Sequence, residues 1–219
     1  MYIFLLTFFL LYGAMHLYVF LKARAAFAFG TGISIYIILF MLIMVLAPLI
    51  VRLSEKHGFE FLARLMSYAG YIWLGLLFLF FCVSIILDIY RLSIYLGGAL
   101  SQKNLSAVIP SARFSFFLPL LFSICIAIYG YFEATDISLD KVTIKTSKIP
   151  KEVGKLKIVQ ISDVHLGLIV REERLKKILQ IVKMAEPDIL VSTGDLVDGQ
   201  INGMGGLAGL LQGVNPRYG

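Results

Sequence analysis

Four long apolar runs restrict the fold of this chain more than any other feature. They cover about residues 2–21, 33–51, 68–89 and 114–132. A helix that crosses the hydrocarbon core of a bilayer needs about 20 mostly apolar residues, and each run reaches that length. Charged residues border the runs, namely Lys22, Arg24, Arg52, Arg91, Arg113 and Glu133. The sequence therefore predicts a transmembrane domain of four helices over residues 1–133, with the lipid bilayer as its partner.

The first run is expected to stay in the protein as a helix. A cleaved signal peptide begins with basic residues and has an apolar core of about 7–15 residues. No basic residue precedes the run at 2–21, which continues for about 20 residues. Lys22 and Arg24 then follow it, as basic residues follow a stop-transfer helix.

Two polar residues within the runs are expected to have structural roles. We expect His16 to form an interfacial or interhelical hydrogen bond. We expect Asp88 to pair with Arg91, three residues later on the same helix face. No run combines several acidic or histidine residues, as a proton relay would, so the sequence does not favour a transporter.

The basic residues indicate membrane topology and contact with lipid head groups. The chain carries 20 Lys and Arg against 14 Asp and Glu, but no helix has a dense basic stripe, so no nucleic-acid binding is expected. Counted over the loops alone, the positive-inside rule places the first and third loops in the cytoplasm and the soluble tail outside. Counting Lys141, Lys145 and Lys148 removes the difference, and the basic flank of the first span favours an external tail.

The remainder of the chain has the pattern of a soluble α/β domain. Residues 134–155 are expected to hold a linker and a first strand, because apolar residues partly alternate with polar ones over 137–144. Short β-rich runs then predict strands over 156–162 and 188–192. Between them, apolar residues at three- and four-residue steps predict an amphipathic helix over 171–185. Strand, helix and strand in this order predict a parallel βαβ unit within a domain over 156–219.

Polar residues follow both predicted strands. Asp163 and His165 come after the first strand, and Asp195 comes after the second. Functional groups gather beyond the carboxyl ends of parallel strands, so these three side chains are expected to converge. Mixed carboxylate and imidazole ligands suit Zn, Mn or Fe. A bent loop must turn Asp163 and His165 to one ion, and Gly167 is a candidate for that bend.

Simpler interpretations of these residues exist. A single Asp at a strand end is usually a turn residue or a helix cap, but two strands that each end on such a group are rarer. The segment 203–208 fits a G-x-G-x-x-A pattern. It lacks the preceding strand and the later acidic residue of a dinucleotide site, so a loop and a short helix over 207–212 are expected.

Two segments together resemble a known family. Residues 161–167, Ile-Ser-Asp-Val-His-Leu-Gly, and residues 193–199, Thr-Gly-Asp-Leu-Val-Asp-Gly, resemble the first two motifs of the calcineurin-like metallophosphoesterases, in particular their membrane-associated bacterial branch. The resemblance implies that Asp163 and His165 bind a first metal ion and that Asp195 bridges two ions. It implies that Asp198 is not a ligand and orients a histidine of the next motif. It also implies hydrolysis of a phosphate ester by a water that two ions activate.

The sequence departs from the family pattern after these motifs. The family continues with a Gly-Asn-His motif and further histidines, whereas no histidine follows His165 here. We therefore expect a truncated metallophosphoesterase domain that holds at most one weakly bound ion, in place of the two ions (Mn, Zn or Fe) of a complete domain. The leading hypothesis is a membrane-anchored phosphoesterase of a bacterial cell membrane that acts on a phosphate ester. Because the protein is anchored in a membrane, a lipid-linked phosphate is one candidate substrate. The alternative is a catalytically inactive membrane anchor or interaction protein with a vestigial half-domain.

Overall fold

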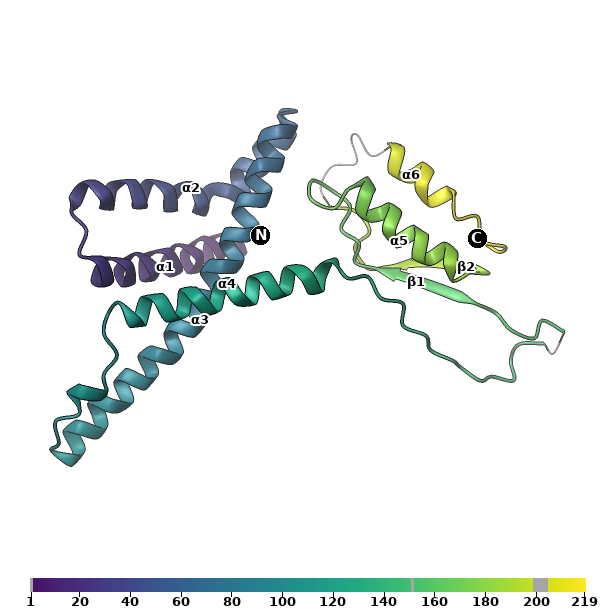
Figure 1. Cartoon of the computed structure of the whole chain (residues 1–219). Helices are drawn as coiled ribbons and strands as arrows, with labels where there is room; N and C mark the ends of the chain where they lie inside the picture. The colour runs from purple at the N-terminus through teal and green to yellow at the C-terminus, as the bar shows by residue number, and fades with distance from the viewer. Residues whose placement is uncertain (1, 151, 199–204) are drawn as a thin grey trace. The chain divides into compact units, whose positions relative to one another are not determined.

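Figure 1 shows the computed structural model of the chain, which describes residues 2–150, 152–198 and 205–219. The chain divides into two compact units, Met1–Ala134 and Thr135–Gly219, and each is described by itself. Unit 1 is helical, and unit 2 combines helices with a small parallel sheet.

Unit 1 contains four long helices. They are α1 (Tyr2–Phe27), α2 (Thr31–Lys56), α3 (Glu60–Ser101) and α4 (Phe114–Thr135), with a short 3-10 helix at Ser106–Val108. All four are long and apolar enough to cross a membrane, which confirms the predicted multi-span helical domain. Each helix continues past its apolar run, since the flanking residues also favour helix. The extension is largest for α3, which has 42 residues.

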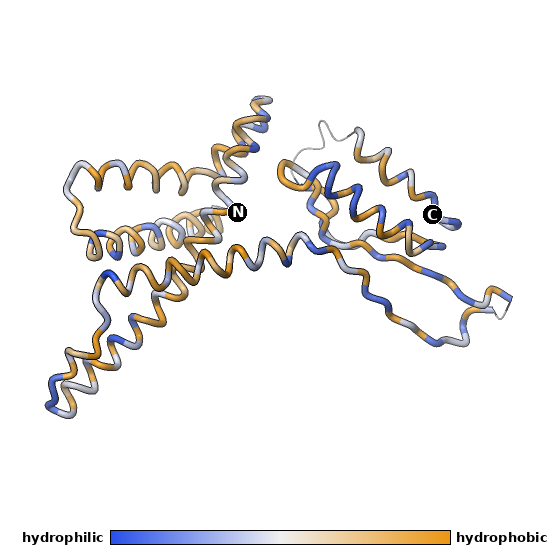
Figure 2. The backbone as a smooth tube through the Cα atoms, viewed as in Figure 1, coloured by the Kyte–Doolittle hydropathy of each residue, from blue (hydrophilic) through white to orange (hydrophobic). Residues whose placement is uncertain are grey.

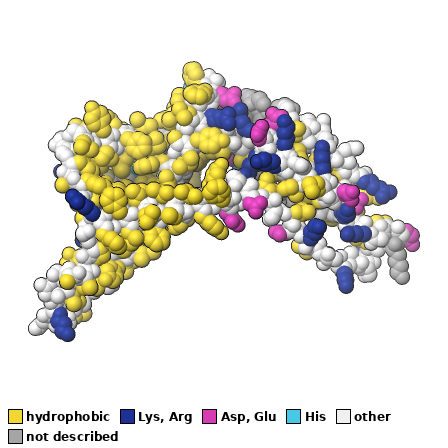
Figure 3. All heavy atoms as spheres, in the orientation of Figure 1, with side chains coloured by type: hydrophobic (Ala, Val, Ile, Leu, Met, Phe, Trp, Pro, Cys, Tyr) yellow, Lys and Arg dark blue, Asp and Glu magenta, His cyan; other side chains and the backbone are white. Residues whose placement is uncertain are grey.

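The helices of unit 1 pack through a small core and expose most of their apolar surface. The core joins Tyr12 and Phe20 of α1 to Met41 of α2 and to Leu77 and Phe80 of α3. Figures 2 and 3 show that hydrophobic residues also cover the outside of these helices. Such a surface suits lipid, which is as apolar as the side chains themselves.

Helices α2 and α3 approach each other closely at Gly70. A Cβ atom added there would lie 2.9 Å from the Cβ atom of Ala47. A small residue at this crossing therefore lets the two backbones approach, as is common between membrane helices.

His16 and Asp88 form hydrogen bonds between helices. His16 donates from Nδ1 to the Tyr12 carbonyl at 2.8 Å and accepts at Nε2 from the Trp73 indole at 2.8 Å. The expected interhelical hydrogen bond is thus confirmed. The expected partner of Asp88 is wrong, because its carboxylate binds Lys22 and the Tyr18 hydroxyl of α1. The packing of α1 along α3 brings these partners in, and spacing within one helix does not reveal them.

Unit 2 is built on two parallel strands. Strand β1 (Ile158–Ser162) pairs with β2 (Ile189–Thr193), and α5 (Glu172–Met184) connects them. This arrangement confirms the predicted βαβ unit. Val159 and Ile161 of β1 are buried against Leu175 and Leu179 of α5. Helix α6 (Gly205–Gln212) follows β2 and adds partly buried leucines to this core.

The strand expected over 137–144 is not formed. This stretch of the linker is extended, but the described sheet consists of β1 and β2 alone. Val142 and Ile144 are almost fully exposed. An alternating pattern becomes a strand only where a neighbouring strand supplies hydrogen bonds, and no described segment pairs with this one.

Candidate metal centre

The register of the two strands brings the candidate ligands together. Ser162 at the end of β1 lies opposite Thr193 at the end of β2. Backbone bonds continue past the strands, from the His165 N–H to the Asp195 carbonyl at 3.0 Å and from the Leu166 N–H to the Leu196 carbonyl at 2.9 Å. The two loops therefore run side by side directly beyond the sheet, and the polar residues of one loop face those of the other.

The loop after β1 alternates between buried and exposed residues. Val164 and Leu166 are buried in the core of unit 2, whereas Asp163 is exposed and His165 is partly exposed. Asp163 and His165 both have positive φ angles, 51° and 52°. Non-glycine residues rarely adopt this conformation, and it costs about 1–3 kcal/mol per residue. Such strain is typical of functional sites, and here it keeps both polar side chains on the outer face of the loop.

Gly167 does not make the bend that the sequence suggested, because the bend lies at Asp163 and His165 themselves. A Cβ atom at Gly167 would lie 3.1 Å from both the Cβ atom and the carbonyl oxygen of Asp198. Glycine at this position therefore allows the two loops to pack closely.

Three side chains form a cluster at this edge of the sheet. Asp163, His165 and Asp195 each offer a ligand atom, and these atoms all lie within 4.8 Å of one another. All three residues are at least partly exposed. The structure therefore brings together, on a surface open to solvent, the three residues that the sequence predicted as metal ligands.

Hydrogen bonds keep the Asp163 carboxylate ionised. The Ser162 hydroxyl donates to Oδ2 at 2.5 Å, and the Asp195 N–H donates to Oδ1 at 3.3 Å. The pKa of Asp163 is lowered, first by the Ser162 hydroxyl and then by the Asp195 backbone. An ionised carboxylate is the form that binds a metal ion.

Gly194 leaves room for this carboxylate. Its φ angle is +73°, and a Cβ atom there would collide with both oxygens of Asp163. Ser162 and Gly194 belong to the two motifs, but the sequence alone indicated no role for them. Their contribution depends on the pairing of the two loops, which the sequence does not display.

Asp198 forms a hydrogen bond with His165. Its Oδ1 accepts a hydrogen bond from His165 Nδ1 at 2.8 Å. The bond to Asp198 raises the pKa of His165 above its ordinary value, and the other nearby carboxylates add to this effect. Because Nδ1 is engaged, Nε2 is the nitrogen available to a metal ion. The partner of Asp198 is thus a residue of the first motif, whereas the resemblance implied a histidine of a later one. Gly199, the last residue of the second motif, lies outside the described residues.

These features fit a divalent ion. The donor set joins two carboxylates to an imidazole, the combination that Zn, Mn and Fe accept. The hydrogen bond from His165 to a carboxylate is the usual support of a ligating histidine. The missing side chain of Gly194 leaves room for the Asp163 carboxylate, and the left-handed backbone at Asp163 and His165 orients the two candidate ligands.

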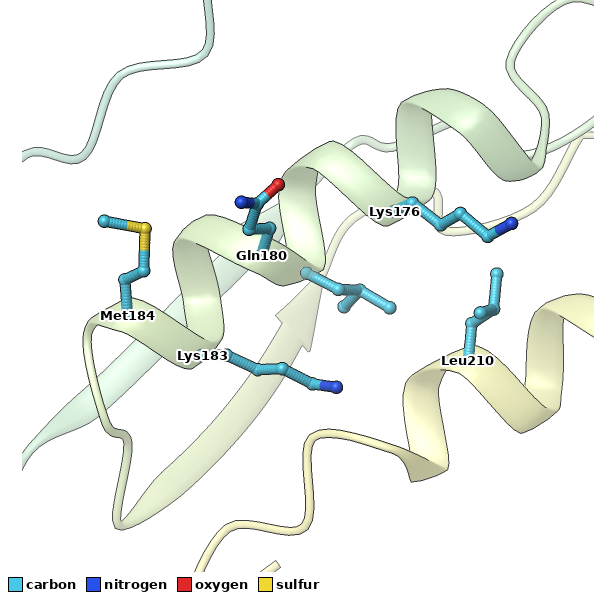
Figure 4. A pocket seen from close by; sticks show the side chains of 6 residues that line it. Lys176, Gln180, Lys183, Met184 and Leu210 are labelled. Atoms are coloured by element: carbon cyan, nitrogen blue, oxygen red, sulfur yellow. The ribbon is translucent and has the colours of Figure 1, made fainter.

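A separate groove of about 460 Å³ lies between α5 and α6 (Figure 4). Its lining consists of Lys176, Leu179, Gln180, Lys183, Met184 and Leu210. One of its lysines, Lys176, is already paired with Glu172 at 2.6 Å. None of the three candidate ligands lines this groove, so it does not contribute to the candidate metal centre.

Known proteins resemble this chain around the same residues. The family model of the calcineurin-like phosphoesterases matches residues 156–214. An uncharacterised metallophosphoesterase of Aquifex aeolicus is 36% identical over 100 residues, covering 46% of this chain and 38% of that protein. A transmembrane protein with a metallophosphoesterase domain from Danio rerio is 32% identical over 126 residues, covering 56% of this chain and 29% of that protein. No solved structure gave a significant match.

The matches cover only part of the relatives, and they extend beyond unit 2 of this chain. The chain spans well under half the length of the curated relatives it matches. Both matches are also longer than unit 2, which covers residues 135–219, so the similarity reaches into the membrane helices. The resemblance drawn from the two motifs is thereby confirmed: residues 156–214 match the calcineurin-like phosphoesterases, and one of the relatives is named as a transmembrane protein.

Proposed function

We propose that this chain is a membrane-anchored, metal-dependent phosphoesterase that binds its metal through Asp163, His165 and Asp195. The observation that supports the proposal is the convergence of these three side chains, with ligand atoms within 4.8 Å of one another at the carboxyl edge of the sheet. The similarity of residues 156–214 to the calcineurin-like phosphoesterases supports a phosphate ester as the substrate. Hydrolysis of such an ester is the reaction that we assign to the site.

The residues of the site have separate tasks in this proposal. Asp163, His165 and Asp195 donate the ligand atoms, and Asp198 fixes the orientation of His165. Ser162 and Gly194 hold and accommodate the Asp163 carboxylate. When bound, divalent ions supply a water of lowered pKa and positive charge for the phosphoryl oxygens. We further propose that two ions (Mn, Zn or Fe) serve the complete site, with Asp195 shared between them.

The membrane anchor supports a more specific substrate. Unit 2 follows α4 through the connecting residues 136–157, so it is tethered to the membrane helices. We propose a lipid-linked phosphate ester as substrate and a bacterial cell membrane as the location. Activity on phosphatidic acid in vesicles, compared with soluble p-nitrophenyl phosphate, which is also a monoester, distinguishes a lipid-linked substrate from a soluble one.

The metal site is tested by Asp195→Asn in the full chain in detergent micelles. The amide cannot replace the carboxylate, so Mn²⁺ affinity measured by calorimetry should fall by at least about 100-fold, beyond the usual effect of losing an outer partner. Phosphodiesterase activity should fall with it.

Asp140→Asn is the matched control for this experiment. It removes one exposed carboxylate from the linker and should leave Mn²⁺ affinity unchanged. Equal affinities for Asp195→Asn and the unsubstituted chain would refute the metal site. Metal binding that depends on Asp195 without hydrolysis of any phosphate ester would favour an inactive anchor protein.

A further inference from the structure

The last part of α3 and the loop that returns to α4 form a distinct element of unit 1. We call residues 90–113 the basic arm. Lys22 of α1 binds Asp88 of α3, so α1 lies beside α3 as far as Asp88. Arg113 Nε donates to the Ala26 carbonyl at 3.4 Å, which places the start of α4 beside the end of α1. Helix α3 nevertheless continues to Ser101, and Figure 1 shows the arm extending beyond the other helix ends of unit 1.

The arm is folded on itself. The left-handed residue Gln102 ends α3, and the Lys103 N–H bonds to the Gly98 carbonyl at 3.1 Å. The Tyr90 hydroxyl donates to the Val108 carbonyl at 3.4 Å. The return loop therefore lies along the helix, and the two segments present one common surface.

That surface is apolar and uncovered. No residue of the arm is buried. The large apolar side chains of the arm that are more than half exposed are Leu92, Tyr95, Leu96, Leu100 and Val108. Exposed apolar surface of this kind normally marks contact with a membrane or another protein.

The charge of the arm favours a membrane over a protein as its contact. Its charged residues are Arg91, Lys103 and Arg113, and no Asp or Glu occurs between residues 89 and 132. Basic residues interspersed with Leu and Tyr are typical of elements that lie in the head-group region of a bilayer. Anionic lipids attract such segments electrostatically.

The length of α3 agrees with this location. Its 42 residues correspond to about 63 Å at about 1.5 Å per residue, whereas the hydrocarbon core of a bilayer is about 30 Å thick. The apolar run at 68–89 is long enough to cross by itself. The residues that follow it therefore emerge into the interface between hydrocarbon and water.

We propose that the basic arm lies in the lipid head-group region and binds anionic phospholipids through Arg91, Lys103 and Arg113. The apolar side chains enter the boundary of the acyl chains, and the three cations face the lipid phosphates. This surface is independent of the candidate metal centre.

The proposal is tested with a fluorescent label at position 100. Cys82 and Cys125, the two cysteines of the chain, are replaced by serine, and Leu100→Cys carries an environment-sensitive fluorophore. The full chain is reconstituted in vesicles of phosphatidylcholine with an equal amount of phosphatidylglycerol. We expect spin-labelled phosphatidylglycerol to quench the label more strongly than spin-labelled phosphatidylcholine, and acrylamide in the water to quench it poorly.

Two controls are needed to interpret this experiment. A label at Lys177→Cys, on the exposed face of α5, should be open to acrylamide. Lys103→Gln should reduce the preference for the anionic lipid by about fivefold, whereas Lys56→Gln at the end of α2 should not change it.

Three results would overturn the proposal. In the first, acrylamide reaches positions 100 and 177 equally well. In the second, the two spin-labelled lipids quench equally. In the third, neither acrylamide nor lipid reaches the label, which would assign the arm to a protein partner or a second copy of the chain.

Discussion

Asp163 and His165 have left-handed backbone conformations, and a carboxylate or hydroxyl supports each of their side chains. Backbone strain at two ligand residues separated by one position is costly, and the pairing of the two loops maintains it. Single substitutions at these residues or at their hydrogen-bond partners should therefore disturb the site strongly.

The bond from His165 to Asp198 can be measured through the pKa of His165. In metal-free protein we expect this pKa to lie above the ordinary value of 6.5, because protonated imidazole is stabilised by the Asp198 carboxylate. Asp198→Asn should lower it, so the histidine loses its proton at a lower pH. NMR titration of histidine-labelled protein in the presence of a chelator measures the change, and Asp140→Asn serves as control. An unchanged pKa in Asp198→Asn would contradict the assigned hydrogen bond.

Gly194 gives a second prediction at this scale. Gly194→Ala should weaken Mn²⁺ binding by about 10-fold or more, because the new Cβ atom displaces the Asp163 carboxylate. Gly154→Ala is the matched control, since Gly154 also has a positive φ angle but nothing lies within 4 Å of its Cβ position. Both variants should lose about 1–2 kcal/mol of stability from the backbone alone. Equal Mn²⁺ affinities, measured by calorimetry, would show that the collision is absent.

At the scale of elements, the helices of unit 1 depend on close approach at few positions. Gly70→Val should destabilise unit 1 by about 1–3 kcal/mol, because the larger side chain forces α3 away from Ala47 of α2. Gly75→Val is the control, since nothing lies near its Cβ position and the change in helix propensity is the same. Thermal unfolding in detergent, followed by the fluorescence of Trp73, compares the two variants. Equal midpoints would contradict a tight α2–α3 crossing.

Unit 2 shows why sequence patterns succeeded for some elements and failed for another. The amphipathic pattern over 171–185 became α5, because its apolar stripe packs on β1. The alternating pattern over 137–144 did not become a strand, because a strand requires a paired neighbour. Periodicity reports which face of an element is apolar, and it does not report whether a partner is available.

At the scale of the whole molecule, the spans determine which side of the membrane unit 2 occupies. The segments that join the first apolar run to the second and the third to the fourth contain Lys22, Arg24, Arg91, Lys103 and Arg113, and the segment that joins the second run to the third contains Arg52, Lys56 and Arg64. This count leaves out the three lysines of the linker. By the positive-inside rule we propose that unit 2 lies outside the cytoplasm.

Trypsin tests this topology. The exposed linker residues Lys141, Lys145 and Lys148 offer cleavage sites. Trypsin added to right-side-out vesicles should release unit 2, and inside-out vesicles should protect it until detergent is added. The reverse pattern would place unit 2 in the cytoplasm.

The sequence by itself determined the class of the fold and the identity of the candidate ligands. The length of an apolar run is a local property, so the four spans could be predicted from the sequence alone. Asp163, His165 and Asp195 were identifiable because each follows a short β-rich run, and parallel strands bring their carboxyl ends to one edge.

Only the tertiary structure decided how these residues are supported. The contacts of Asp88 with Lys22, of Asp198 with His165 and of Gly194 with Asp163 join residues that are between 31 and 66 positions apart in the chain. No local pattern encodes such contacts, because they arise from strand register and helix crossing. The same holds for the basic arm, whose uncovered surface became visible once the ends of α1 and α4 were placed beside α3.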